Sequence, residues 1–394
     1  MEKLRKLVNE IAYTSLSSSH KLSPLQRSVI PFLSIASSLY RLALSLRRQL
    51  YYSGIFRRRR LPVPVISVGN LTWGGNGKTP MVESIALFLA DSGISPLILT
   101  RGYACGDEAN MLQRHLLGTS ARIGVGANRF ATAACFLERY GYVDPRNGVS
   151  FDRPCIDQEV ELHLNSEKVG AVILDDGMQH LSLWRDLEIA MINGLMPWGN
   201  CQLVPLGPLR EPLTALERAD VAVVHHADLA VEQNLKDIEL MIREVNESIP
   251  IFFSRMSPSY FFTAVDINLK IPLKAVCNRV VLCVSAIGFS DAFVQGVGKI
   301  GPSFVDRLDF SDHHLFQDKD IDVIRTTLGN LEDQFGSKPI LIVTEKDYDR
   351  DPEILKHLDP FEVLVLCSQL QIISGQGNTE ESLRKVFKQL LKVI

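Results

Sequence analysis

The sequence predicts an α/β fold, with a mostly parallel sheet covered by helices on both faces and a smaller C-terminal α/β domain. First, the 394 residues are enough for two or three domains. Second, beyond residue 60, short apolar runs alternate with helical stretches, and such runs are typical of parallel strands buried on both faces. Third, a glycine-rich loop follows the first run and opens a helix.

The alternation can be followed along the chain. In the first part, turn residues bound each apolar run, and the expected strands are 63–68, 96–100, 169–174, 187–192 and 221–225. The expected helices there are 80–91 and 128–140. In the second part, the expected strands are 280–285, 340–343 and 362–366, and the expected helices are 318–335 and 380–393. A βαβ order of this kind predicts a parallel sheet in each part.

These elements suggest four segments. Residues 1–60 form a basic N-terminal segment for membrane association or targeting, and residues 61–250 form the core that carries the glycine loop. Residues 251–278 alternate aromatic, polar and proline residues, which favours an extended connector. Residues 279–394 form the smaller C-terminal domain.

Composition excludes several classes of protein. The formal net charge is −3, so bulk attraction to nucleic acid is not expected. The seven cysteines include no C-x-x-C pair, which favours a reducing compartment over a disulfide framework. The histidines show no H-E-x-x-H spacing, so no structural metal site is predicted and any metal is expected to arrive with a substrate.

The N-terminal segment is basic and serine-rich, because no acidic residue lies between Glu10 and Glu83. Its apolar run 29–40 is shorter than the roughly 20 residues of a spanning helix. Apolar residues recur at helical spacing, namely Phe32, Ile35, Ala36, Leu39, Ala43 and Leu46. We therefore expect peripheral attachment, with the arginines meeting anionic lipid. An ordinary amphipathic helix and an organellar transit peptide are the alternatives.

The strongest chemical signal is the glycine loop after the first strand. It reads Thr72, Trp73, Gly74, Gly75, Asn76, Gly77, Lys78 and Thr79. Glycines let consecutive backbone N–H groups turn toward a phosphate, a lysine reaches the β- and γ-phosphates, and a hydroxyl can bind Mg²⁺. Thr72 stands where the strict P-loop pattern has glycine, and the pair Gly74–Gly75 is expected to supply the turn. The predicted fold is therefore P-loop NTPase-like.

A second signal is the apolar strand 169–174, which ends in Asp175 and Asp176. A carboxylate at the carboxyl end of a strand beside a phosphate loop can hold Mg²⁺ directly or through water. Adjacent residues of a strand point to opposite faces, so only one of the two acids is expected near the metal. The alternative interpretation is a solvated turn.

Further polar clusters follow other expected strands, where ligands bind in open α/β sheets. They are residues 100–103, 106–108, 179–180, 207–212, 312–314 and 344–347. An arginine there can stabilise a transferring phosphoryl group, and an acid paired with a histidine can remove a proton from a hydroxyl nucleophile.

The order of these motifs resembles the tetraacyldisaccharide 4′-kinase family. The shared strings are PVPVISVGNLTWGGNGKTP, RGY, GDE, DDGMQH, RDLEIAMING, GNCQLVPLGPLREPL, DHH and VTEKD, which together span most of the chain. The resemblance implies transfer of the ATP γ-phosphate to the 4′-hydroxyl of a tetraacylated glucosamine disaccharide 1-phosphate at a membrane surface, giving lipid IVA in lipid A biosynthesis. It also implies Mg²⁺ and a two-domain fold with the active site in the cleft.

The resemblance also implies roles for individual residues. Asp107 resembles the general base and His313 the histidine paired with it, chosen over His314 because it directly follows the aspartate of the motif. Lys78 and Thr79 would handle phosphate and magnesium. The remaining acids around metal and nucleotide would be Glu108, Asp175 and Asp176, and the residues flanking the phosphates would be Arg210 and Glu211. Which acid contacts Mg²⁺ directly stays open.

The chain departs from the family pattern in two places. Only Ala104 and Cys105 separate RGY from GDE, where bacterial members carry a longer insertion, and the stretch 141–168 is longer than in bacterial relatives. With the basic N-terminal segment, these departures suggest an organellar, mitochondrial version in a eukaryote. The alternative location is the cytoplasmic face of a bacterial inner membrane.

Two other functional classes remain open. GG-x-GKT loops followed by a strand-end acid also occur in P-loop ATPase and GTPase switches and in metallochaperones, although this chain has no cysteine–histidine cluster for a cargo metal. A membrane-anchored binding module would leave Asp107 and His313 without a role. A preference for GTP would favour the switch.

Overall fold

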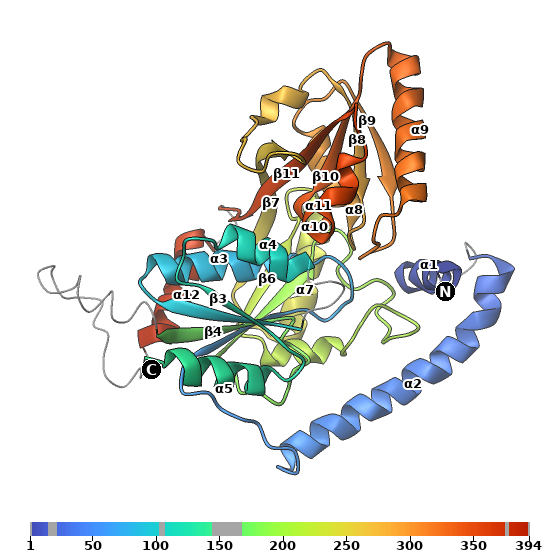
Figure 1. Cartoon of the computed structure of the whole chain (residues 1–394). Helices are drawn as coiled ribbons and strands as arrows, with labels where there is room; N and C mark the ends of the chain where they lie inside the picture. Colours follow the sequence, from blue (N-terminus) through green and yellow to red (C-terminus); the bar gives the residue numbers. More distant parts are fainter. Residues whose placement is uncertain (1, 15–21, 102–106, 144–167, 375–377, 393–394) are drawn as a thin grey trace, which may run out of the picture. The chain divides into compact units, whose positions relative to one another are not determined.

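The computed structural model describes residues 2–14, 22–101, 107–143, 168–374 and 378–392, and it divides into two compact units (Figure 1). Unit 1 comprises residues 1–101, 118–254 and 372–394, and unit 2 comprises residues 102–117 and 255–371. Each unit is therefore assembled from segments that are far apart in the sequence. The shortened RGY–GDE connection and most of the long stretch 141–168 lie outside the described residues.

Unit 1 contains a parallel sheet in the order β3-β2-β4-β1-β5-β6-β7. Its strands are β1 (Val65–Gly69), β2 (Ser95–Thr100), β3 (Arg122–Val125), β4 (Val169–Asp175), β5 (Leu187–Asn193), β6 (Val221–His225) and the first residues of β7 (Ile251–Thr263). Every residue of β1, β2, β5 and β6 is buried. This burial explains the continuous apolar runs of the sequence, and it confirms the predicted α/β fold.

Helices cover both faces of this sheet. α3 (Lys78–Asp91) buries Met81, Ile85 and Leu89, and α5 (Arg129–Tyr140) begins at an N-cap, Asn128, whose side chain accepts a hydrogen bond from the backbone of Ala131. Figure 1 shows α3 above the sheet of unit 1 and α5 below it. The other helices of this unit include α7 (Glu232–Val245), the 3-10 helix η4 (Leu213–Arg218) and α12 (Glu380–Lys392).

Unit 2 contains a second sheet in the order β7-β11-β10-β8-β9. Its strands are the remainder of β7, β8 (Val280–Ser285), β9 (Phe304–Asp309), β10 (Ile340–Thr344) and β11 (Glu362–Ile372). Alternate residues of β8 face opposite sides: Leu282 packs in the cluster that contains α9 (Asp318–Phe335), and Val281 packs in the cluster around Val276 and Val297. Unit 2 also contains α4 (Asp107–His115), η5 (Leu273–Val276), α8 (Ser290–Gly298), α10 (Glu345–Arg350) and α11 (Pro352–Lys356).

The structure divides the chain differently from the predicted segments. The expected connector 251–278 contains the long strand β7, which pairs with β6, and the helix η5. α4 belongs to unit 2, although it lies inside the expected core 61–250. α12 belongs to unit 1, where Phe387 packs on Phe88 with 5.6 Å between ring centroids. Amphipathicity predicts a helix but does not identify the sheet on which it packs.

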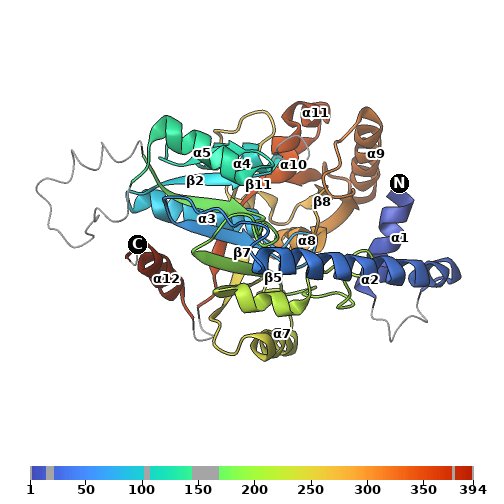
Figure 2. The ribbon, with the colours of Figure 1, turned by 90° about the horizontal axis from the view of Figure 1, so that it is seen from below.

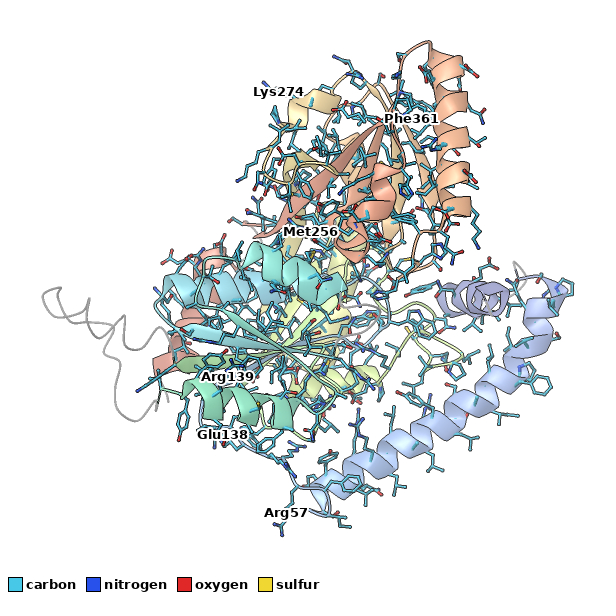
Figure 3. The ribbon with its side chains drawn as sticks, viewed as in Figure 1. Arg57, Glu138, Arg139, Met256, Lys274 and Phe361 are labelled. Carbon is cyan, nitrogen blue, oxygen red and sulfur yellow. The ribbon has the colours of Figure 1, made fainter. Side chains whose placement is uncertain are left out.

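The N-terminal segment forms α1 (Glu2–Tyr13) and α2 (Pro24–Tyr52), which Figure 2 shows as one long rod. Ser23 and Gln26 form a capping box at the start of α2, and Pro31 is accommodated near its first turns. With 29 residues, α2 extends well beyond the apolar run 29–40. By length and composition it is the one helix of the described chain that is long and apolar enough to cross a membrane. The basic run that begins with Arg57 follows α2 (Figure 3).

Candidate active site

The glycine loop connects β1 to α3 in unit 1, as the sequence predicts. Two of its glycines have left-handed backbone conformations, Gly74 at φ 96° and Gly77 at φ 74°. A Cβ on Gly77 would also lie 2.5 Å from Cδ2 of His225. Gly77 is therefore required both by its conformation and by the close approach of the His225 ring.

Thr72 has a structural task that explains why glycine is not needed at the first loop position. Its buried hydroxyl accepts a hydrogen bond from Asn76 Nδ2 at 3.1 Å, and its backbone forms an antiparallel bridge with Leu209. The next residue, Trp73, donates its backbone N–H to Pro208 at 3.1 Å. The loop is thus joined to the segment that carries Arg210.

Asp176 is the centre of the charge cluster beside the loop. Arg210 binds both of its carboxylate oxygens, at 2.8 and 2.9 Å, and Lys78 Nζ lies 3.6 Å from Oδ1. Lys78 also donates to Asn70 Oδ1 at 3.3 Å, and Arg210 donates to the carbonyl of Asn70 at 3.1 Å. Burial alone would raise the pKa of Asp176, but the two cations outweigh it and lower the pKa to about 2. The carboxylate is therefore charged at neutral pH.

The two adjacent acids have different environments, as expected. Asp175 is the last residue of β4 and is buried, and its carbonyl accepts a hydrogen bond from Arg129 at 3.4 Å. Asp176 has a left-handed conformation, with φ 52°, which turns it out of the strand. The turn is held because Gly177 donates to the Val68 carbonyl at 3.0 Å.

Several buried polar atoms around the loop have no hydrogen-bond partner within the described residues. They are Asn70 Nδ2, Trp73 Nε1, Gln179 Oε1 and Arg210 Nε. Buried polar atoms are normally satisfied, so this concentration of donors beside a phosphate loop fits an anionic ligand with several oxygens.

A divalent cation also fits this site if the ligand supplies some of its oxygens. The described part of the chain has no group of three or more His, Cys, Asp or Glu side chains that could hold a metal alone. Thr79 is buried in the first turn of α3, and Asp175 and Asp176 end the strand beside β1. Mg²⁺ usually takes one or two protein carboxylates together with phosphate oxygens and water.

Glu211 lies next to Arg210, but its carboxylate has other partners. It binds Arg48 of α2 at 3.1 Å and Arg218 at 2.9 and 3.0 Å. Those cations outweigh the effect of burial and lower the pKa of Glu211. The printed contacts of Glu211 therefore connect it to α2 and η4, which differs from the expected place beside the phosphates.

Arg47 and Arg48 also differ from the expectation that the arginines of α2 meet lipid. Arg47 donates to the carbonyl of Gln179 at 2.9 Å, and Arg48 pairs with Glu211. On the same face of α2, the Tyr40 hydroxyl donates to the carbonyl of Arg210 at 2.9 Å. The spacing of Tyr40, Arg47 and Arg48 places them on one helix face, which is the signal that could have indicated protein contacts.

Three functional candidates that the sequence analysis left without a role lie around the loop. Asn70 directly follows β1, Asn193 Nδ2 donates to the carbonyl of Gly75 at 3.2 Å, and His225 packs on Gly77. Each lies at the carboxyl end of a parallel strand, where ligand-binding residues of open α/β sheets lie. Their position after a predicted strand could have identified them.

The remaining predicted residues lie in unit 2. Asp107 is the first residue of α4, and Glu108 follows it, with Oε1 3.1 Å from Lys346 Nζ. His313 follows β9 with φ 61°, and its Nε2 lies 3.8 Å from Asp312 Oδ2. The ring of His314 is held by Asp320 at 2.8 Å and stacks on Phe310. Unit 1 thus contains the predicted phosphate-binding residues, and unit 2 contains the predicted base and histidine.

Comparison with known proteins is consistent with this division of residues. The family model described as LpxK, tetraacyldisaccharide-1-P 4'-kinase, matches residues 29–105 and 104–388. A relative from Arabidopsis thaliana, named probable tetraacyldisaccharide 4'-kinase, mitochondrial, is 60% identical over 373 residues, which are 94% of this chain and 93% of the relative. A tetraacyldisaccharide 4'-kinase of Halothermothrix orenii is 32% identical over 349 residues, or 84% of this chain and 86% of that protein.

A solved structure shows the same fold. It is described as an "apo" form of LpxK from Aquifex aeolicus in complex with ATP, and it matches with a TM-score of 0.60 and 24% identity over 93% of this chain and 99% of that one. The family model and the relatives cover most of the sequence, including the glycine loop and the DDGMQH turn. The chain therefore belongs to the tetraacyldisaccharide-1-P 4'-kinase family.

Proposed function

We propose that the chain is an ATP-dependent lipid kinase that phosphorylates the 4′-hydroxyl of tetraacyldisaccharide 1-phosphate and so produces lipid IVA for lipid A biosynthesis. The observation that carries the proposal is the cluster of Lys78, Asp176 and Arg210 beside a glycine loop in a chain of this family. Phosphoryl transfer needs cations placed around the transferring group more than it needs covalent help from the protein.

The residues of unit 1 would bind the nucleotide. The amides of Gly74 to Gly77 and the N-terminus of α3 attract the phosphates, and Lys78 and Arg210 neutralise the charge that spreads over the transferring group. Thr79 and one of the acids Asp175 and Asp176 would hold Mg²⁺, which bridges phosphate oxygens when it is bound. ATP is the expected phosphoryl donor, since the related Aquifex protein is described in complex with ATP.

The residues of unit 2 would act on the acceptor. Asp107 is proposed to take the proton of the 4′-hydroxyl, and His313 to orient or support that base. The different environments of the two neighbouring histidines support His313, because Asp320 and Phe310 already hold the ring of His314.

The proposed acceptor is a glycolipid, and α2 is proposed to meet the membrane that contains it. The large apolar side chains of α2 that are 55–74% exposed are Phe32, Ile35, Leu39, Leu42 and Leu46. Their spacing of three and four residues places them on one helix face, which suits the interface of a bilayer. The name of the Arabidopsis relative supports a mitochondrial location for this chain.

Membrane attachment is tested by co-sedimentation of the full chain with vesicles that contain anionic lipid. Leu42→Asp, in the middle of the stripe, should release the protein from the vesicles. Ser45→Asp is the matched control, since Ser45 is exposed on the same helix and adds the same charge outside the stripe. Equal sedimentation of the two variants would contradict attachment through the stripe.

The reaction is tested by transfer of label from γ-labelled ATP to tetraacyldisaccharide 1-phosphate in detergent micelles. Labelled lipid is expected from the wild type, with much less from Lys78→Ala. Hydrolysis of ATP without labelled lipid, or a preference for GTP, would instead favour a P-loop switch or metallochaperone.

A further inference from the structure

The sequence motif VTEKD lies in unit 2, and the nucleotide site gives it no role. Its residues Thr344 to Asp347 end β10 and begin α10, and two of them are buried carboxylates: Glu345 is 7% exposed and Asp347 is 1% exposed. A buried carboxylate is costly unless ion pairs and hydrogen bonds satisfy it. The partners of these two side chains therefore indicate what the motif does.

Glu345 and its neighbours hold α4. Glu345 Oε1 accepts hydrogen bonds from Arg114 at 2.9 Å and from His115 at 2.6 Å. Arg114 also binds both carboxylate oxygens of Asp349, at 3.0 and 2.7 Å. Because His115 is the last residue of α4, these bonds fix the C-terminal end of that helix.

Lys346 holds the other end of α4. Its Nζ lies 3.1 Å from Oε1 of Glu108, the residue that directly follows Asp107. α4 is therefore attached to α10 at both ends, and the proposed base is the first residue of the attached helix.

Asp347 holds the loop that contains His313. Its Oδ1 accepts a hydrogen bond from the backbone N–H of Ala286 at 3.1 Å and another from Arg350 at 2.9 Å. The carbonyl of Ala286 accepts the backbone N–H of His313 at 3.1 Å. Arg350 in turn donates to the carbonyl of His314 at 3.0 Å. Two successive hydrogen bonds thus connect the carboxylate of Asp347 to the backbone of His313.

We propose that the TEKD residues Glu345, Lys346 and Asp347 are positioning residues that set Asp107 and His313 relative to each other. α10 does this with two faces, since Glu345, Lys346 and Asp349 contact α4, whereas Asp347 and Arg350 contact the loop after β9. The inference rests on the proposed function, because the roles of Asp107 and His313 belong to it. It explains how two residues that are distant in sequence are held by one short helix.

The test compares Glu345→Gln and Asp347→Asn with the wild-type full chain in the lipid-labelling assay. Both variants keep the size of the side chain and remove its charge. We expect kcat to fall by about tenfold or more, while KM for ATP stays within about twofold, because the proposed nucleotide-binding residues are in unit 1. Glu353→Gln is the matched control, since Glu353 is a surface carboxylate of α11 whose pair is Lys356, and it should leave both constants unchanged.

The outcomes separate the inference from the proposed function. If the wild type labels no lipid, the proposed function fails and the inference fails with it. If the wild type is active and the variants show a lower melting temperature but an unchanged kcat per folded molecule, the motif only stabilises unit 2 and the inference alone is overturned. If a buried variant does not fold, Lys346→Met provides the same comparison, because its partly exposed side chain leaves no buried charge behind except that of Glu108 at the helix start.

Discussion

Arg48 of α2 and Glu211 form a 3.1 Å ion pair across 163 residues of sequence. The pair connects the helix whose outer face carries the exposed apolar stripe to the residue that follows Arg210 in the nucleotide site. Tyr40, on the same inner face of α2, donates to the carbonyl of Arg210 itself. The face of α2 opposite the proposed membrane contact is therefore part of the support of the nucleotide site.

Removing Arg48 should destabilise unit 1 modestly. In Arg48→Gln, Glu211 keeps Arg218 but loses its second cation, which should lower the free energy of unfolding by about 1 kcal/mol, since the Arg48 side chain is 36% exposed and partly screened. The melting temperature measures this effect. Arg41→Gln is the matched control, because Arg41 is exposed on the same helix. An equal loss in the two variants would show that the ion pair contributes nothing.

The close approach of His225 to Gly77 predicts that Gly77→Ala abolishes nucleotide binding. The new methyl group would collide with the imidazole ring, and the residue would keep a left-handed conformation that alanine disfavours. Gly54→Ala is a matched control, since Gly54 has φ +78° but open space around its Cβ position. It should reduce stability by about 1 kcal/mol and leave nucleotide affinity unchanged. Binding of a fluorescent ATP analogue measures both; comparable affinities for the two variants would refute the predicted collision.

Lys78 and Arg210 should have separable effects on the reaction. Lys78→Ala should weaken both ATP binding and phosphoryl transfer, because the lysine is expected to contact the phosphates before and during transfer. Arg210→Gln should also remove the bidentate partner of Asp176 and raise the pKa of that carboxyl. We expect kcat/KM to fall by about a hundredfold or more in each. Unchanged kinetics of Lys78→Ala would contradict the phosphate-loop assignment.

Asp107→Ala and His313→Ala should lower turnover far more than nucleotide affinity, since both residues are assigned to proton removal and lie in unit 2. Comparison of kcat for lipid labelling with the dissociation constant for ATP checks this. His357→Ala, an exposed histidine at the end of α11, is the control and should retain full turnover. Intact turnover in either test variant would remove that residue from the mechanism.

The nucleotide site could be predicted from the sequence because its main parts are local. A buried strand, a glycine loop and a helix follow one another directly, and Lys78 and Thr79 have fixed places in that order. The assignment of helices to units could not be predicted, since α4 and α12 are held by partners more than 200 residues away, such as Asp349 for Arg114 and Phe88 for Phe387. The partners of Glu211 are also set by tertiary contacts, so its adjacency to Arg210 was misleading.

Buried histidines should make the folded chain sensitive to mild acid. Burial is the first cause that lowers the pKa of His180 and His226 to about 4, and it lowers the pKa of His225 well below its usual value. Below pH 6.5 the unfolded chain therefore binds protons that the folded chain does not bind. Stability is complete above about pH 6.5 and falls as the pH drops toward 4, by up to about 1.4 kcal/mol per pH unit for each such histidine.

The pH dependence can be tested by urea unfolding between pH 8 and pH 5. His226→Asn removes one of the three groups, and asparagine tolerates the left-handed conformation of this position, where φ is 61°. The free energy of unfolding of the variant should therefore fall less steeply below pH 6.5 than that of the wild type. At pH 8, where the histidines are neutral in both states, the variant reports only the packing lost against the His225 ring, whose centroid lies 4.0 Å from that of His226. Parallel curves for the two proteins would show that His226 is not a source of the acid sensitivity.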